Sequence, residues 1–150
     1  MPAIEVVAIE DNPDDVELIR LALEQASLDF NLHRFKDGRD AIDNFCCSPQ
    51  NHDNRFVPDI ILLDVNLPRA DGFEVLKRIK QTPHLANVPI VVTSSSPADA
   101  DQMTSYLHGA SLYIEKSPLL EQYLFAISDA VEKLTRNVSP AVRTKSQHAD

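Results

Sequence analysis

One stretch of this sequence carries the clearest structural signal: Ile60-Ile61-Leu62-Leu63-Asp64, followed by Val65-Asn66-Leu67-Pro68. Four consecutive apolar residues predict a strand covered on both faces, as in the middle of a parallel sheet. Asp64 then lies at the tip of that strand. Burying a carboxylate costs several kcal/mol unless a metal ion or a cation compensates its charge. The position of Asp64 therefore predicts a functional site.

On both sides of this stretch, short apolar runs alternate with amphipathic segments. The runs that predict strands are Ile4–Ile9, Leu28–Phe35, Ile60–Asp64, Pro89–Thr93 and Leu112–Ile114. The segments between and after them carry apolar residues at helical spacing. Capping residues mark helix starts at Asn12-Pro13, Asp37-Gly38, Asp71-Gly72, Ser96-Pro97 and Ser117-Pro118. Five strands alternating with five helices predict an α/β fold with a doubly wound parallel sheet.

Length and composition predict a single domain with an ordinary core. The chain has 150 residues, of which 43% are hydrophobic and 25% are charged. Its periodic pattern stops at Asn137, so we expect a folded domain over residues 1–136 and a flexible tail over residues 137–150. The two cysteines, Cys46 and Cys47, are adjacent and have no zinc-binding spacing. Such cysteines fit a reduced, cytoplasmic protein.

The charge balance excludes several classes of partner. The chain has 23 acidic and 14 basic residues, for a net charge of −9, which argues against binding to nucleic acid or to an anionic membrane surface. No apolar stretch approaches the roughly 20 residues that a membrane span needs. The first residues lack the basic region and apolar core of a signal peptide. We therefore expect no nucleic-acid partner, no membrane partner and a cytoplasmic location.

Polar residues follow four of the five predicted strands, at the edge where an open parallel sheet binds its ligands. They are Glu10 and Asp11 after the first strand, Asp64 and Asn66 after the third, Thr93 to Ser96 after the fourth, and Lys116 after the fifth. Three carboxylates at short range repel one another and stay ionised at neutral pH only beside a multivalent cation. Oxygen ligands alone favour a hard ion, and Mg²⁺ fits best.

The charges of this predicted site suit phosphoryl chemistry. Three acids, a divalent metal ion and Lys116 sum to a formal charge of zero, so the site can accept a phosphoryl dianion that metal and lysine offset. Transfer of such a group needs mainly positioning and electrostatic stabilisation. Asp64 is the best nucleophile, because it comes from the central strand and faces the metal.

Several of these motifs together resemble the receiver domain of two-component response regulators, the CheY-like fold. They are Glu10-Asp11, Asp64-x-Asn66-x-Pro68-x-x-Asp71-Gly72, a hydroxyl after the fourth strand, and Tyr113-x-x-Lys116. The match covers roughly residues 4–135, and its motifs occur in order at mutually consistent spacing. The resemblance implies a flavodoxin-like sheet of five strands in the order 2-1-3-4-5, with five helices.

The resemblance also implies a role for each site residue. Asp64 is the expected phosphoacceptor. The expected Mg²⁺ ligands, besides Asp64, are Asp11 directly, Glu10 through water, and the backbone carbonyl of Asn66. Lys116 is expected to contact the phosphoryl oxygens. Tyr113 is the aromatic residue whose rotamer is expected to report phosphorylation.

The switch hydroxyl of the family corresponds to Ser94 rather than to the neighbouring Thr93. Members of the family place this hydroxyl five residues after the proline that opens the fourth strand and 22 residues before the lysine. Counted from Pro89 and from Lys116, both spacings select Ser94. Thr93 is then expected to point to the opposite face of the strand and to pack.

A narrower resemblance comes from the run Glu10 to Leu18, the polar loop before the third strand and the Lys116-Ser117 step. With no output domain in the sequence, they resemble single-domain regulators that work with bacterial phytochrome-type histidine kinases. Two positions depart from the family. Glu10 stands where Asp is commoner, and Ser117 stands where proline is usual, often after a cis bond. A cis peptide before a non-proline residue costs roughly 2.5–4 kcal/mol, so either the loop stays cis or it takes another course.

Three functions compete on these residues. The leading one is a phosphorylation-switched signalling module without an enzymatic activity of its own, which promotes its own phosphorylation and dephosphorylation. A pseudo-receiver that binds a partner without being phosphorylated is the first alternative, because of Ser117. A haloacid-dehalogenase-like phosphatase is the second, but its Asp-x-Asp pair is absent, since position 66 is Asn. Asp14 and Asp15 are interpreted only as acids that favour a helix N-terminus.

The expected partners are proteins. They are a sensor histidine kinase, in the narrower reading of phytochrome type, and a second copy of the chain. The resemblance places self-association on the face formed by the fourth helix, the fifth strand and the fifth helix.

Overall fold

The computed structural model describes residues 3–46, 56–67, 72–95 and 99–136. Within them the five strands are β1 (Ile4–Ile9), β2 (Phe30–Phe35), β3 (Ile60–Asp64), β4 (Ile90–Ser94) and β5 (Leu112–Glu115). The helices are α1 (Pro13–Gln25), α2 (Gly38–Ala41), which continues into a π-helical turn η1 (Ile42–Cys46), α3 (Gly72–Gln81), α4 (Asp99–Leu107) and α5 (Leu120–Arg136). With α2 and η1 counted as one, the five strands and five helices confirm the predicted α/β class.

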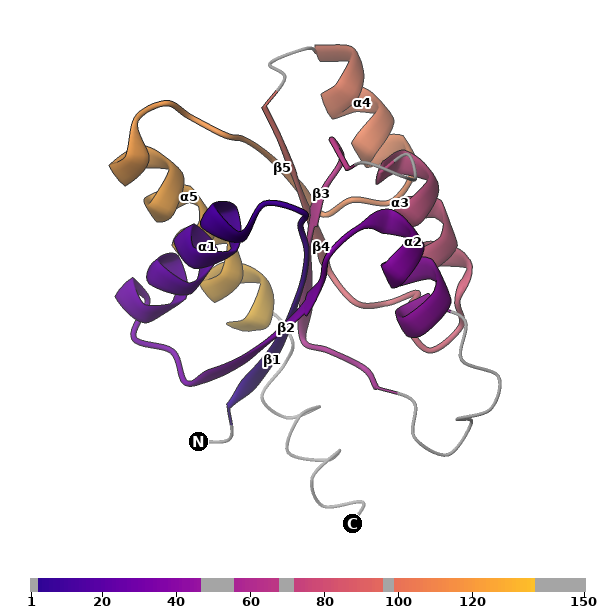
Figure 1. Cartoon of the computed structure of the whole chain (residues 1–150), viewed down its shortest axis with the longest axis horizontal. Helices are drawn as coiled ribbons and strands as arrows, with labels where there is room; N and C mark the ends of the chain where they lie inside the picture. The colour runs from indigo at the N-terminus through magenta and orange to yellow at the C-terminus, as the bar shows by residue number, and fades with distance from the viewer. Residues whose placement is uncertain (1–2, 47–55, 68–71, 96–98, 137–150) are drawn as a thin grey trace.

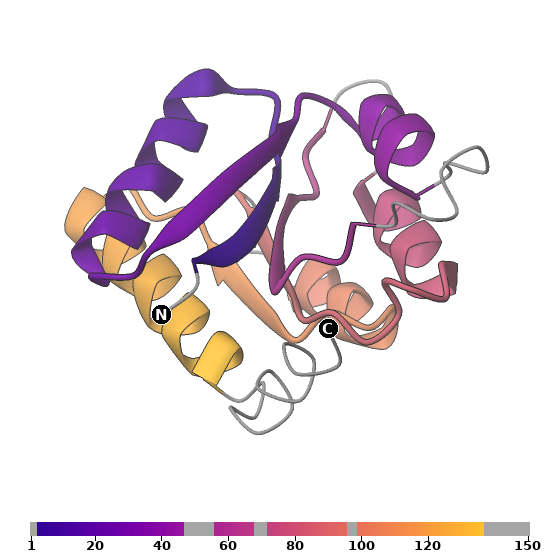
Figure 2. The same ribbon diagram turned by 90° about the horizontal axis from the view of Figure 1, so that it is seen from below.

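All strand pairs are parallel, and the sheet order is β2-β1-β3-β4-β5. The predicted topology is therefore confirmed, with β3 in the middle. Figure 1 shows the sheet nearly edge-on, with α1 and α5 on one face and α2, α3 and α4 on the other. Figure 2 shows the same two layers of helices from below.

Each central strand contributes to two hydrophobic clusters, one on each face of the sheet. Val7, Ile9, Ile61 and Leu63 pack toward α2, η1 and α3, whereas their strand neighbours pack toward α1 and α5. Alternate residues of a strand point to opposite faces, so a strand buried on both faces must be apolar throughout. This is the physical reason why β3 is a continuous apolar run that ends in Asp64.

Local signals set most of the helix boundaries. The Asn12 side chain accepts a hydrogen bond from the Asp14 amide at 2.9 Å, and Asp37 accepts one from the Asp40 amide at 2.7 Å, so both predicted N-caps are confirmed. Gly109 has a φ of 103°, as expected for the left-handed residue after a helix. The predicted helix start at Ser117-Pro118 was wrong by two residues, because α5 begins at Leu120. The Ser117 hydroxyl instead accepts a hydrogen bond from the Leu119 amide in a turn before the helix.

Three predictions fall outside the described residues. They are the helix starts at Asp71 and Ser96-Pro97 and the flexible tail over residues 137–150. Cys47 also lies outside them, whereas Cys46 is a free, buried cysteine. None of the described helices is long and apolar enough to cross a membrane.

Candidate functional site

Two neighbouring strands bring three carboxylates to the carboxyl edge of the sheet. Ile9 of β1 lies opposite Leu63 of β3, so the next residues, Glu10 and Asp64, are neighbours, and Asp11 follows. One carboxylate oxygen of each lies within 4.8 Å of the others. Glu10 and Asp64 are buried, whereas Asp11 is exposed. This set of hard oxygen donors fits a divalent cation that keeps part of its water shell.

The Lys116 side chain enters this site from the end of β5. Its Nζ donates hydrogen bonds to Asp64 Oδ2 at 3.0 Å, to Glu10 Oε1 at 3.2 Å and to Asp15 Oδ2 at 2.9 Å. The described residues contain no cis peptide bond, so the bond between Lys116 and Ser117 is trans. Of the two courses open to this loop, the structure takes the one without a cis bond, and the lysine still reaches Asp64.

The pKa values of two groups at this site, Glu10 and Lys116, are both raised. Burial, followed by the charge of Asp64, raises the pKa of Glu10 to about 8. Burial acts to lower the pKa of Lys116, but the hydrogen bond that it donates to Asp15 and the charges of Glu10 and Asp64 outweigh burial and raise that pKa. The lysine is therefore charged at neutral pH, and without a metal ion Glu10 is largely protonated there.

Asn66 connects the loop after Asp64 to the end of β4. Its backbone amide donates to Asp64 Oδ1 at 2.8 Å. Its side-chain Oδ1 accepts from the hydroxyl of Ser94 at 3.1 Å and from the Ser95 amide at 3.1 Å. Ser94 is fully buried and ends β4, so the structure places it beside the site. Thr93 pairs with Asp64 along the strand and, being adjacent to Ser94, directs its side chain to the opposite face.

Tyr113 lies on β5, opposite Val92 of β4. Its ring is half-buried against the hydrophobic cluster on the α3 side of the sheet. The structure therefore places it on the strand that leads to Lys116, three residues before the lysine.

The structure places two residues at this site that the sequence analysis did not predict there. Arg34, near the end of β2, donates from Nε to the Glu10 carbonyl at 3.1 Å and from Nη2 to the Asp11 carbonyl at 2.8 Å. Asp15 does more than favour the start of α1, since it gives Lys116 the shortest of its three carboxylate contacts. The available signals were weak. Arg34 is near the carboxyl end of the strand beside β1, and Asp15 lies one helical turn after Asp11.

Comparisons with known proteins give a consistent picture. The response regulator receiver domain family matches residues 6–127. The chain is 35% identical over 127 residues to response regulator Rcp1 of Synechocystis sp., covering 85% of each chain. The crystal structure of the phosphorylated cyanobacterial phytochrome response regulator RcpA superposes with a TM-score of 0.80 at 33% identity, over 92% of this chain and 98% of that one.

Two further solved structures bear on the site and on the subclass. The Mn²⁺-bound form of Rcp1 has a TM-score of 0.78 at 31% identity, over 91% of this chain and 97% of that one. The bacteriophytochrome response regulator AtBRR has a TM-score of 0.66 at 32% identity, over 85% of this chain and 91% of that one. The narrower resemblance, to regulators associated with phytochromes, is thereby confirmed. With its sheet order, its acidic pocket and the family match over residues 6–127, the chain belongs to the response regulator receiver domain family of two-component signalling.

Proposed function

We propose that this chain is a single-domain response regulator that accepts a phosphoryl group from a histidine kinase on Asp64 in a Mg²⁺-dependent reaction. The observation that carries this proposal is the surroundings of the Asp64 carboxylate. One of its oxygens accepts from Lys116, and the carboxylates of Glu10 and Asp11 approach it within 4.8 Å. A buried acid between a cation and a metal-type pocket is arranged for phosphoryl transfer rather than for stability.

The transfer conserves its atoms and charges. An oxygen of Asp64 attacks the phosphorus and forms an O–P bond, while the P–N bond to the kinase histidine breaks. The leaving imidazole keeps the electron pair and takes up a proton. Hydrolysis reverses the state of the site, because water attacks the phosphorus and releases inorganic phosphate and the Asp64 carboxylate.

Each neighbouring residue has a role in this proposal. Asp11, Asp64 and the Asn66 carbonyl hold Mg²⁺ directly, and Glu10 holds it through water. When bound, this ion offsets the negative charge of the acids and of the phosphoryl group. Lys116 binds a phosphoryl oxygen. Ser94 supplies the switch hydroxyl and Tyr113 the aromatic ring that changes rotamer.

The output proceeds through protein contacts at the face of α4, β5 and α5. Apolar side chains are exposed on the two helices and just before α5; they are Met103, Tyr106, Leu107, Leu119, Leu120 and Phe125. A cytoplasmic kinase of phytochrome type is the proposed donor, in keeping with the relatives, and a second copy of the chain is a proposed partner at this face. In this view the receiver domain ends at residue 136, and neither nucleic acid nor membrane is bound.

The test compares Asp64→Asn with the wild-type chain and with Asp43→Asn, an exposed aspartate on η1. Wild type and Asp43→Asn are expected to take phosphoryl label from acetyl phosphate with Mg²⁺, and to take none when the ion is chelated before the donor is added. Asp64→Asn is expected to take none. Equal labelling of Asp64→Asn would overturn the proposal, and a wild-type chain that takes no label from any donor would favour a pseudo-receiver.

A further inference from the structure

All three N–H donors of the Lys116 ammonium are taken up by carboxyl oxygens. An ammonium has three N–H donors, and Asp15, Asp64 and Glu10 each accept one, at distances of 2.9, 3.0 and 3.2 Å. A phosphoryl group on Asp64 can therefore gain a hydrogen bond from this lysine only if one of the three acids gives up its own. The proposed function thus requires an exchange of partners at Lys116.

Asp15 is the partner best placed to give way. Its side chain is 21% exposed, whereas the side chains of Glu10 and Asp64 are 3% and 4% exposed. It also lies on α1, outside the strand ends that hold the other two acids. Once it loses the lysine, however, Asp15 is an anion next to a newly arrived phosphoryl group. It then needs another hydrogen-bond donor.

Tyr123 offers such a donor. Its side chain is 97% buried, as the residue is 3% exposed, and its hydroxyl has no hydrogen-bond partner among the described residues. Native proteins seldom leave a buried hydroxyl unpaired, so this one is free to donate to an acceptor that comes within reach. Burial raises the pKa of Tyr123, and the charges of Lys116, Glu10 and Asp15 also act on it. The phenol is therefore a protonated donor close to the lysine cluster.

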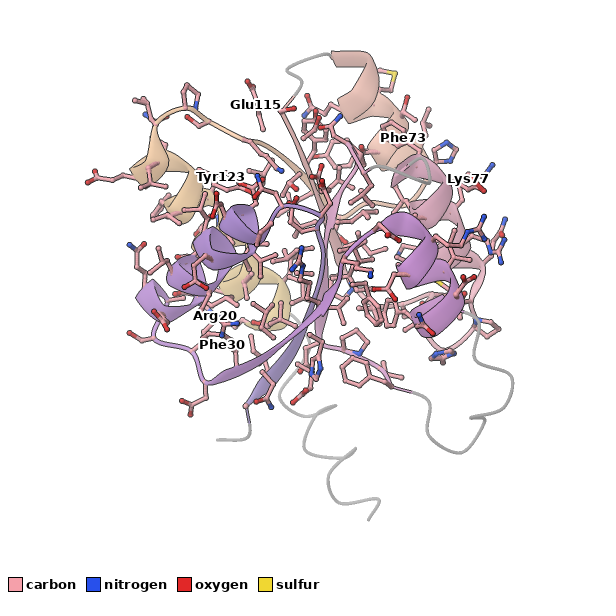
Figure 3. The ribbon with its side chains drawn as sticks, in the orientation of Figure 1. Arg20, Phe30, Phe73, Lys77, Glu115 and Tyr123 are labelled. Carbon is pink, nitrogen blue, oxygen red and sulfur yellow. The ribbon has the colours of Figure 1, made fainter. Side chains whose placement is uncertain are left out.

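The packing of the helices puts Tyr123 and Asp15 on facing elements. Tyr123 belongs to the same hydrophobic cluster as Ile19 of α1, and Figure 3 shows it on α5 where this helix lies beside α1. We propose that Asp15 and Tyr123 are positioning residues for Lys116. Asp15 holds the ammonium in the resting site, and the Tyr123 hydroxyl takes over the Asp15 carboxylate when the ammonium turns to a phosphoryl group on Asp64. This inference rests on the proposed function.

The test uses beryllofluoride, which stands in for a phosphoryl group, and the full chain with Mg²⁺. Melting temperatures measured against beryllofluoride concentration give an apparent affinity for each variant. Tyr123→Phe is expected to bind beryllofluoride about tenfold more weakly, the loss typical of a hydrogen bond to a charged group. Its melting temperature without beryllofluoride is expected to stay the same or rise, because the resting hydroxyl has no partner to lose. A purely structural tyrosine would leave the beryllofluoride affinity unchanged.

A double variant assigns the effect to Asp15. In an Asp15→Asn background the phenol meets a neutral amide oxygen in place of a carboxylate, so Tyr123→Phe is expected to change beryllofluoride affinity less than it does in the wild-type chain. Ser128→Ala, which removes a hydroxyl from a partly buried position of the same helix, is the matched control and is expected to behave as wild type.

The outcomes separate this inference from the proposed function. Wild-type affinity in Tyr123→Phe overturns the inference alone, and so does an equal loss in the Asp15→Asn background. A wild-type chain that ignores beryllofluoride, or an Asp64→Asn chain that responds to it as wild type does, overturns the proposed function and this inference with it.

Discussion

Ser94 donates its hydroxyl to the side-chain oxygen of Asn66, at 3.1 Å. The two residues lie 28 positions apart in the sequence, at the ends of adjacent strands. The proposed switch hydroxyl is thus bonded to the loop that follows Asp64. A phosphoryl group on Asp64 would have to draw this hydroxyl away from Asn66, so the bond couples the state of the site to the end of β4.

Removing this hydroxyl should separate phosphorylation from the response. We expect Ser94→Ala to be labelled on Asp64 by acetyl phosphate, because the nucleophile and Lys116 are intact. The structural change at β5 and α4 should be lost, since the phosphoryl group has no hydroxyl to draw. Backbone amide NMR spectra with and without beryllofluoride measure that change. Thr93→Val is the matched control and should respond as wild type; the reverse pattern would assign the switch to Thr93.

The raised pKa of Glu10 predicts that metal binding depends on pH. Its pKa lies at about 8, above the ordinary value of 4.5, so the metal-free folded chain holds a proton there that the unfolded chain releases. The contribution of this group to the free energy of unfolding therefore falls as pH rises from about 4.5 to about 8.

Mg²⁺ needs the ionised carboxylate, so its affinity should rise over the same range as the proton is displaced. Melting temperatures with Mg²⁺ and with chelator, measured from pH 6 to pH 8.5, are expected to diverge progressively, and Glu10→Gln should flatten the divergence. A constant Mg²⁺ affinity across this range in the wild-type chain would contradict the assignment.

The two hydrogen bonds that Arg34 donates to backbone carbonyls predict that it positions Glu10 and Asp11. Arg34→Lys keeps the positive charge near the site but loses the two-pronged contact to the Glu10 and Asp11 carbonyls. We expect Mg²⁺ affinity to fall about tenfold, as for other residues that orient metal ligands. Calorimetric titration measures it, and Arg20→Lys on α1 is the matched control, since Arg20 pairs only with Glu17 at the surface. Equal Mg²⁺ affinities for the two variants would show that Arg34 does not position the metal ligands.

Close packing at Gly72 predicts a cost for any larger residue. A Cβ at this position would clash with Cα of Val65, the residue after Asp64. We expect Gly72→Ala to lower the free energy of unfolding by about 1–3 kcal/mol through overpacking, and to slow labelling of Asp64 because the backbone next to it must shift.

Gly109→Ala separates these two effects of Gly72→Ala. Its left-handed φ of 103° predicts a loss of about 1–2 kcal/mol, but the added Cβ meets only the flexible side chain of Lys80. Labelling should then be unchanged. Urea denaturation and a phosphorylation time course measure both quantities, and slowed labelling in Gly109→Ala would mean that stability alone governs the rate.

The amino-acid sequence by itself determined the fold class, the order of the elements and the acids at the strand ends. These follow from local rules: β3 must be apolar throughout because both its faces are covered, and Asn12 and Asp37 cap helices through hydrogen bonds to amides two or three residues away. The carboxyl ends of parallel strands share one edge, so the sequence alone could predict that Glu10, Asp11, Asp64 and Lys116 lie close together.

Only the tertiary structure decided how that site is completed. The contact of Lys116 with Asp15 spans 101 positions, and that of Arg34 with the Glu10 carbonyl spans 24. Such contacts depend on how α1 and β2 lie against the strand ends, which no local periodicity records. The same holds for the trans course after Lys116 and for the unpaired hydroxyl of Tyr123. Hydrophobic spacing specifies which face of an element is buried, whereas the partner of a polar side chain is specified only when distant elements have packed.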